Sequence, residues 1–342
     1  MRIKEIDIAR GFTVFIMPGV HALMLYGNNA ARTSWLGMIF GFLAEGPGAP
    51  LFMFLMGTSF YFSKRKNLLP VLKRAAGLLT VAYLLNFLKF ALLQLFHVLP
   101  GDFIKDYGIS KGNKGVWELL LTGDILQFAT IALVVLGLIN KIKWRYAISL
   151  SLIFIIVIIS PITTGFEANY LLDLFTAEHG LVFFPVFPWL VYPLAGFCSI
   201  YLLKKKNGFW VCFYCGIMLL GISFFLSQLY DIPLTENFYR SRPVATTYHL
   251  GVVLMWLWLC HIAIKIIEPG MICKLFYWLS KNILSIYIIQ WPIVCWLLPV
   301  AGYRVNDIIQ TAIWMMFVSF LSFMIMYLYE WLIKKELKYA QR

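Results

Sequence analysis

Apolar residues of this 342-residue chain gather into ten long runs, and polar or charged breaks separate each run from the next. A transmembrane helix needs about 20 mostly apolar residues, and most of the runs reach that length. The predicted spans are residues 12–27, 35–62, 75–98, 117–139, 146–163, 183–203, 208–229, 247–267, 275–299 and 308–333. The pattern therefore predicts an all-α polytopic membrane protein with about ten transmembrane helices, folded as a single domain over residues 1–342.

Two of these runs carry local signals of their own. The second contains the sequence GPGAP at residues 46–50, and because proline cannot continue the helical hydrogen bonds, we expect a broken helix there. The first follows the basic stretch MRIKEIDIARG at residues 1–11, which resembles the start of a signal peptide. No small-residue cleavage site follows it, so a retained first helix is predicted.

The composition excludes an ordinary soluble protein. Hydrophobic residues make up 61% of the chain and charged residues only 13%, and the mean hydropathy is +0.80. A soluble domain carries about 25% charged residues, so lipid must cover much of this surface. No long hydrophilic segment forms a separate domain, and we expect a bacterial inner membrane, with a eukaryotic organelle as the alternative.

The net charge of +13 raises the question of a nucleic-acid partner. Its distribution favours a different origin. With the N-terminus in the cytoplasm, the inner segments hold 20 Lys and Arg residues and the outer segments hold 7. Positively charged loops resist translocation. Both termini are therefore predicted in the cytoplasm, and no nucleic-acid partner is predicted.

Ionisable side chains inside spans are costly in lipid, so each is a functional candidate. They are His21, Glu45, Lys89, His97, Glu118, Asp124, His249, His261, Lys281 and Glu330. We interpret Lys89, Lys281 and Glu330 as residues near span ends that snorkel to the interface. His97 and His261 are interpreted as structural or interfacial.

His21 stands out because it follows Arg10 by eleven positions without an intervening charge. Eleven residues rise about 16 Å along a helix and complete about three turns. One helix face is therefore expected to carry a guanidinium near the cytoplasmic end and an imidazole deep in the membrane, unless Pro18 bends the helix between them. The alternative is a histidine that only bonds to neighbouring helices.

The Arg10-to-His21 spacing resembles the R-x10-H motif of the membrane-bound acyltransferase-3 family. The surrounding residues also resemble the heparan-α-glucosaminide N-acetyltransferase group and its bacterial relatives. The similar segments are IDIARGF (6–12), APLFMFLMGTSFYFSKRK (49–66), GDILQFATIALV (123–134), FPVFPWLVYPLAGF (184–197) and LSKNILSIYIIQ (279–290). The resemblance implies ten or more helices, acetyl-CoA or another acyl-CoA as the donor on the cytoplasmic side, and an acceptor reached from the far side.

Two departures from the family pattern leave the acceptor open. The position of His21 is often asparagine in the glucosaminide enzymes. A later family segment that ends in Y-x-x-H ends here in Tyr287-x-x-Gln290, so no second histidine can be carried over.

Acyl transfer from a thioester needs a base for the acceptor or a relay nucleophile, and histidine supplies either near neutral pH. His21 is the predicted catalytic residue, and both routes remain open. The phosphates of the donor favour basic partners. Arg10, Lys73 and Arg74 are the predicted donor-binding residues, and Lys64, Arg65 and Lys66 are secondary candidates. For both groups the alternative is that the basic residues only determine the membrane topology. No permanently bound cofactor is predicted.

Further polar residues complete the candidate site. Asp124 and Gln127 share a helix face at i, i+3 spacing and either orient His21, bind the acceptor or bond to a neighbouring helix. Glu45, beside the glycine and proline break, either fixes the tautomer of His21 or binds a sugar. The remaining candidates for the acceptor mouth or site lining are Trp189, Tyr192, Tyr248 and His249.

Cys212-x-x-Cys215 lacks a second ligand pair, so neither a metal site nor a redox site is predicted. The first function hypothesis is an integral-membrane acyltransferase that acetylates a hydroxyl or amine of a sugar, glycan or lipid-linked saccharide. A transporter or flippase of a polar or lipid-linked substrate is the alternative, although no inverted repeat supports it. A non-catalytic membrane scaffold is the third. Binding of acyl-CoA distinguishes the first from the others.

Overall fold

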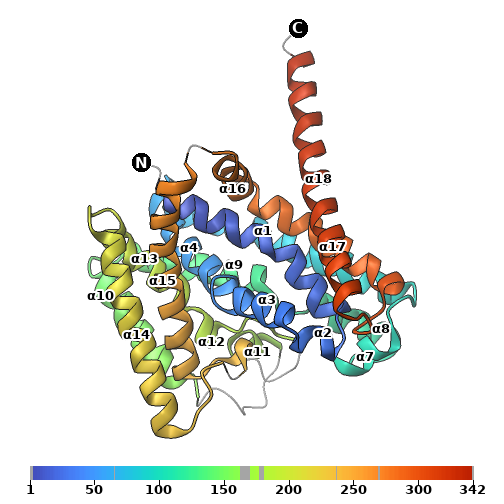
Figure 1. Ribbon diagram of the computed structural model, residues 1–342, viewed down its shortest axis with the longest axis horizontal. Coiled ribbons are helices and arrows are strands. Elements are labelled where there is room, and N and C mark those ends of the chain that lie inside the picture. Colours follow the sequence, from blue (N-terminus) through green and yellow to red (C-terminus); the bar gives the residue numbers. More distant parts are fainter. Residues whose placement is uncertain are drawn as a thin grey trace. The chain divides into compact units, whose positions relative to one another are not determined.

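The computed structural model describes residues 3–64, 66–161, 170–176, 181–235, 237–268 and 270–340 (Figure 1). These residues fold almost entirely into helices. Within these described ranges, eight helical stretches are long and apolar enough to cross a membrane. They are Lys4–Tyr26, Trp35–Phe62, Leu68–Leu95, Val186–Leu203, Gly208–Tyr230, Pro243–Ile267, Ile283–Ala301 and Ile308–Lys334. With the shorter apolar helices Ile125–Ile139 and Arg145–Ile159, they follow the ten predicted runs in order, which confirms the all-α polytopic fold.

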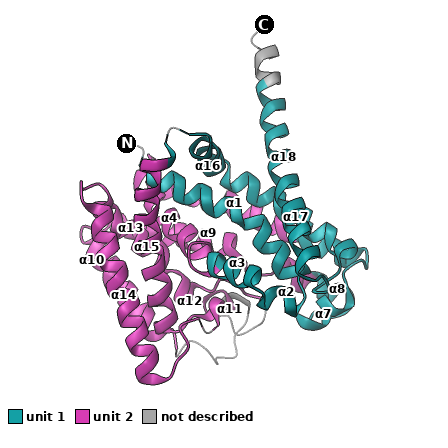
Figure 2. Cartoon of the chain, viewed as in Figure 1, with its two compact units in different colours: residues 1–44, 87–116, 267–342 teal, residues 45–86, 117–266 magenta. Residues whose placement is uncertain are grey.

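The chain divides into two compact units (Figure 2). Unit 1 comprises residues 1–44, 87–116 and 267–342, and unit 2 comprises residues 45–86 and 117–266. A single domain over the whole chain stays a prediction.

Unit 1 is built around α1 (Lys4–Tyr26), which packs against α16 (Met271–Lys281), α17 (Ile283–Ala301) and α18 (Ile308–Ala340). Its other elements are α2 (Asn29–Thr33), most of α3 (Trp35–Glu45), the π-helix η1 (Phe87–Ala91), α6 (Leu92–Leu95), α7 (Gly101–Asp106) and the first part of α8 (Gly112–Leu120).

Close contact between α1 and α16 depends on Gly11. A Cβ atom at this position would lie 2.2 Å from the carbonyl oxygen of Phe276. The Phe276 ring packs edge-on against Phe12 and Phe15 at centroid distances of 6.3 and 6.1 Å. Glycine therefore lets the two backbones touch while the rings cover the contact.

Unit 2 contains the other helices. They are α4 (Ala49–Phe62), α5 (Leu68–Asn86), α9 (Ile125–Ile139), α10 (Arg145–Ile159), α11 (Tyr170–Thr176), α12 (Val186–Trp189), α13 (Val191–Leu203), α14 (Gly208–Tyr230), the 3-10 helix η2 (Phe238–Arg240) and α15 (Pro243–Ile267). The closest packing joins α4 and α13. A Cβ atom on Gly57 would lie 1.9 Å from the carbonyl oxygen of Pro193, and one on Gly196 would lie 1.9 Å from that of Phe54.

The predicted break at residues 46–50 is confirmed, because α3 ends at Glu45 and α4 begins at Ala49. Two predicted spans differ from the structure. The span 275–299 is wrong at its start, since α16 and α17 are separate helices that meet at Asn282. The span 117–139 is interrupted, since α8 ends at Leu120 and α9 begins at Ile125.

The interruption before α9 involves a residue of another helix, Asn86 at the end of α5. The Asn86 amide donates to the carbonyl oxygens of Leu120 and Thr122 at 3.0 and 2.7 Å, which satisfies backbone groups that a continuous helix would use. Gly123 bonds through its own backbone to Leu181 and Phe183. The chain therefore runs in an extended form before α9 starts.

Candidate functional site

His21 lies half-buried on α1, five residues before the end of that helix. The side-chain amide nitrogen of Gln290 lies 3.1 Å from Nδ1 of the His21 ring. The indole of Trp291 stacks on the same imidazole, with ring centroids 4.1 Å apart and an angle of 28° between the planes. Two consecutive residues of α17 thus hold the edge and the face of one intramembrane imidazole.

The indole of Trp291 also contacts a buried cation. The ammonium of Lys89 lies 4.4 Å from the Trp291 ring centre, and the residue is only 2% exposed. Lys89 occupies the middle of the π-helix η1. The interpretation of Lys89 as a snorkelling residue is wrong, because the wider turn directs its side chain into protein.

Arg10 lies on α1, which continues as one helix through Pro18 to Tyr26. Its guanidinium pairs with the Asp7 carboxylate at 3.6 Å. Asp7 also accepts a hydrogen bond from the Ser280 hydroxyl at 3.2 Å. Arg10 therefore belongs to a polar group that joins α1 to α16, and its role toward the donor stays a prediction.

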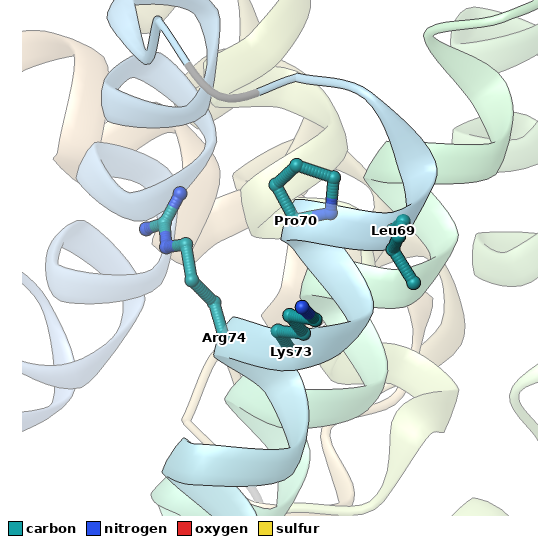
Figure 3. Close-up of a pocket in the computed structure, with 4 residues that line it drawn as sticks. All are labelled: Leu69, Pro70, Lys73 and Arg74. Carbon is teal, nitrogen blue, oxygen red and sulfur yellow. The ribbon is translucent and has the colours of Figure 1, made fainter.

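Lys73 and Arg74 line a pocket of about 370 Å³ together with Leu69 and Pro70, near the start of α5 (Figure 3). The two basic side chains leave the same helical turn, and Arg74 reaches the Ser63 hydroxyl at 3.3 Å. The pocket combines two cations with an apolar rim. Such a surface suits a phosphate-bearing ligand with a hydrophobic part.

Asp124 and Gln127 form a capping box at the N-terminus of α9. The Asp124 carboxylate accepts from the backbone N–H of Ile125 at 2.7 Å, and the Gln127 side-chain oxygen accepts from the backbone N–H of Asp124 at 3.2 Å. The i, i+3 spacing therefore reflects a helix start. The amide nitrogen of Gln127 is buried, and no described group accepts a hydrogen bond from it.

An aromatic cluster surrounds Trp189 in unit 2. The indole packs against Tyr192, Phe238 and Phe128 at 5.3, 5.2 and 6.5 Å, and its Nε1–H donates to a backbone oxygen at 2.8 Å. Phe238 in turn meets His249 edge-on at 5.5 Å. This cluster brings together side chains of α9, α12, α13, η2 and α15.

The cluster contains polar groups without partners. His249 is 0% exposed, and within the described part of the chain neither of its ring nitrogens has a hydrogen-bond partner. The same holds for the buried hydroxyl of Tyr192. Beside His249 in sequence, Tyr248 interacts electrostatically with the Glu45 carboxyl. The predicted acceptor residues thus lie in unit 2, whereas His21 and Arg10 lie in unit 1.

Among the described residues, no group of three or more His, Cys, Asp or Glu side chains could hold a metal ion. Cys212 and Cys215 lie on α14, Cys212 buried and Cys215 partly exposed.

Residues 2–212 match the model of the heparan-alpha-glucosaminide N-acetyltransferase catalytic domain family. The chain belongs to this family. The resemblance to the heparan-α-glucosaminide N-acetyltransferase group is thereby confirmed, and the protein is a membrane acyltransferase. No curated protein and no solved structure matches the chain.

The match to the N-acetyltransferase family covers His21, Arg10 and the pocket of Lys73 and Arg74. It ends before α17, and so before Gln290 and Trp291. Sequence reasoning missed Trp291 altogether, because nothing in an aromatic-rich span distinguishes it. It noted Gln290 only as a departure from the family pattern.

Proposed function

We propose that this membrane acyltransferase moves an acetyl or other short acyl group from cytoplasmic acyl-CoA to a hydroxyl or amine of a sugar, glycan or lipid-linked saccharide. The acceptor is reached from the extracytoplasmic side of a bacterial inner membrane, and both termini lie in the cytoplasm. The observation that carries the proposal is the intramembrane imidazole of His21, held by Gln290 and Trp291 in a chain of this family.

His21 acts either as a general base or as a nucleophile. As a base, it removes the proton of the acceptor, whose oxygen or nitrogen attacks the thioester carbonyl carbon; the C–S bond breaks, and the coenzyme thiolate recovers the proton. As a nucleophile, the ring nitrogen with the lone pair bonds to the carbonyl carbon, the C–S bond breaks, and the coenzyme thiolate takes the proton of the other ring nitrogen. The acceptor then attacks the acyl carbon, the N–C bond breaks, and the proton of the acceptor returns to the imidazole. Either route requires a lone pair on the nitrogen that faces the reactants.

Gln290 decides which nitrogen has that lone pair. An amide can present either its oxygen or its NH₂ group to Nδ1. When the oxygen is presented, Nδ1 carries the proton and Nε2 keeps the lone pair. The structure places the NH₂ group of Gln290 toward Nδ1, so the reactive state that we propose has the amide turned over, with its oxygen toward Nδ1.

Donor and acceptor are proposed to use different basic and aromatic groups. The pocket of Lys73 and Arg74 takes the phosphates of the coenzyme, and Arg10 assists at the cytoplasmic end of α1.

For the acceptor, the support comes from the buried polar atoms of the Trp189 cluster. Gln127 and His249 offer hydrogen-bonding atoms to sugar hydroxyls, and Trp189 and Tyr248 offer ring faces. Asp124 serves this group by fixing the start of α9, and Glu45 serves it through Tyr248.

The test is incubation of the purified protein with radiolabelled acetyl-CoA and a panel of amino sugars and glycans. We expect label to appear on at least one acceptor, and His21→Ala to abolish transfer while acetyl-CoA still raises the melting temperature. His261→Phe is the matched control, because His261 stacks on Phe209 at 4.8 Å and a phenyl ring preserves that contact. Binding of a polar substrate without thioester consumption would instead favour a transporter or flippase.

A further inference from the structure

Lys89 is a buried cation inside an apolar stretch. Residues Leu68–Leu95 are apolar enough to cross a membrane, and Lys89 is 2% exposed within them. A charged side chain at such a position is costly and usually functional. The five residues Phe87–Ala91 are π-helical. This conformation is rare in proteins, and where it occurs it is often at a functional site.

The contacts of Lys89 lead to the imidazole. Its ammonium lies 4.4 Å from the Trp291 ring centre and 5.5 Å from that of Phe90. Phe90 meets Trp291 edge-on at 6.4 Å, and Tyr287 does so at 6.3 Å. Two aromatic rings and one cation therefore contact the indole, and His21 stacks on it at 4.1 Å.

We propose that Lys89 is a positioning residue for His21 and acts through Trp291, a role that rests on the acyl transfer proposed above. A cation attracts the electron-rich face of an indole, and the attraction is strongest away from water. The ammonium therefore fixes the tilt of Trp291, and Trp291 fixes the plane of the imidazole.

This arrangement predicts a loss of rate without a loss of donor binding. Lys89→Met keeps the length and apolar stem of the side chain but removes the charge. We expect kcat for acetyl transfer to fall about ten- to thirtyfold, the range of a desolvated cation–π contact, with KM for acetyl-CoA within twofold of wild type. Lys89→Arg restores a cation over the ring and should recover most of kcat.

A double-mutant cycle tests the route through the indole. Trp291→Leu should lower kcat by itself, and adding Lys89→Met to it should lower kcat little further, because the two residues act as one unit. Lys281→Met is the control, since Lys281 is an exposed lysine of the same unit and should leave kcat unchanged.

Three results would overturn the role of Lys89: wild-type kcat in Lys89→Met, fully additive losses in the cycle, or no recovery in Lys89→Arg. If Lys89→Met does not accumulate, Lys89→Gln replaces it in the same comparison with Lys89→Arg. Failure of the proposed function is separate and visible in the wild-type protein, which would then transfer no acetyl group at all.

Discussion

The side-chain amide of Gln290 lies 3.1 Å from Nδ1 of His21, although 269 positions separate the two residues along the chain. The contact joins α1 to α17 across the interior of unit 1. Gln290, the residue that departs from the Y-x-x-H pattern in the sequence, thus gives His21 a polar partner from α17. A buried amide is well suited to this task, since it can donate or accept according to the tautomer it meets.

Replacing Gln290 should therefore impair catalysis rather than donor binding. Gln290→Leu removes the hydrogen bond and leaves Nδ1 without that partner, at a cost of about 1–3 kcal/mol, so we expect kcat for acetyl transfer to fall about tenfold or more. Gln290→His keeps a hydrogen-bonding side chain at this position and should retain more activity than Gln290→Leu. Steady-state acetyl transfer measures both effects.

Donor binding provides the control for the Gln290 variants. Acetyl-CoA should stabilise Gln290→Leu against thermal unfolding as well as it stabilises the wild-type protein. Full activity in Gln290→Leu would remove the amide from the mechanism.

Substitutions in the pocket of Lys73 and Arg74 should impair donor binding rather than catalysis. A charge-assisted hydrogen bond to a phosphate contributes about 1.5–3 kcal/mol, so Lys73→Ala and Arg74→Ala should each raise KM for acetyl-CoA about tenfold while kcat changes little. Free coenzyme A should stabilise both variants less at equal concentration. Lys206→Ala is the matched control, because Lys206 is an exposed lysine of unit 2 outside this pocket. Unchanged KM values in both variants would contradict the assignment of the donor.

The membrane fold is largely readable from the sequence, and the site is only partly so. Apolar runs of bilayer length must become helices, because lipid offers the backbone no other partner. The break at residues 46–50 is likewise local, since it follows from its own prolines and glycines. Lys89 shows the limit of prediction from the local sequence. Its place near the end of the predicted span 75–98 favours snorkelling, whereas in the structure a single π-helical turn directs its side chain inward.

Most features of the site that the sequence does not predict depend on contacts between helices that are distant along the chain. The stacking of Trp291 on His21 depends on how α17 packs against α1, and no periodicity within either segment encodes it. Asp124 and Gln127 were recognised as a pair from their spacing, but the capping box became visible only with the start of α9 at Ile125. Its boundary is set by Asn86, a residue of another helix.

Tyr303 and Tyr107 predict how stability depends on alkaline pH. Both lie outside the spanning helices, and the Tyr303 hydroxyl donates to Asp106 at 3.2 Å. Burial, the largest cause, raises the pKa of each phenol above its ordinary value of about 10. In the unfolded chain these phenols lose their protons first. The stability they contribute is therefore complete below about pH 10 and is lost as the pH rises toward the higher folded-state pKa.

Melting temperatures measured from pH 8 to 11 check this expectation. The wild-type value should fall above about pH 10, and the fall should be shallower in Tyr303→Phe. Tyr230→Phe is the control, since Tyr230 is exposed and its removal should leave the pH dependence unchanged. If the melting temperature falls with equal slope in all three proteins, Tyr303 does not contribute to the pH dependence of stability.

Gly57 and Gly196 set the distance between α4 and α13, and substituting either should destabilise unit 2. A methyl group at either position would lie 1.9 Å from a backbone carbonyl oxygen of the facing helix, and backbone cannot move aside as a flexible side chain would. Overpacking of this kind costs about 1–3 kcal/mol, so Gly57→Ala and Gly196→Ala should each melt several degrees below wild type in detergent.

Gly77→Ala is the matched control, because nothing lies within 4 Å of the added methyl group. Alanine favours a helix over glycine by about 1 kcal/mol, so Gly77→Ala should melt at or above the wild-type temperature. Equal melting temperatures for all three variants would show that α4 and α13 do not touch at these glycines.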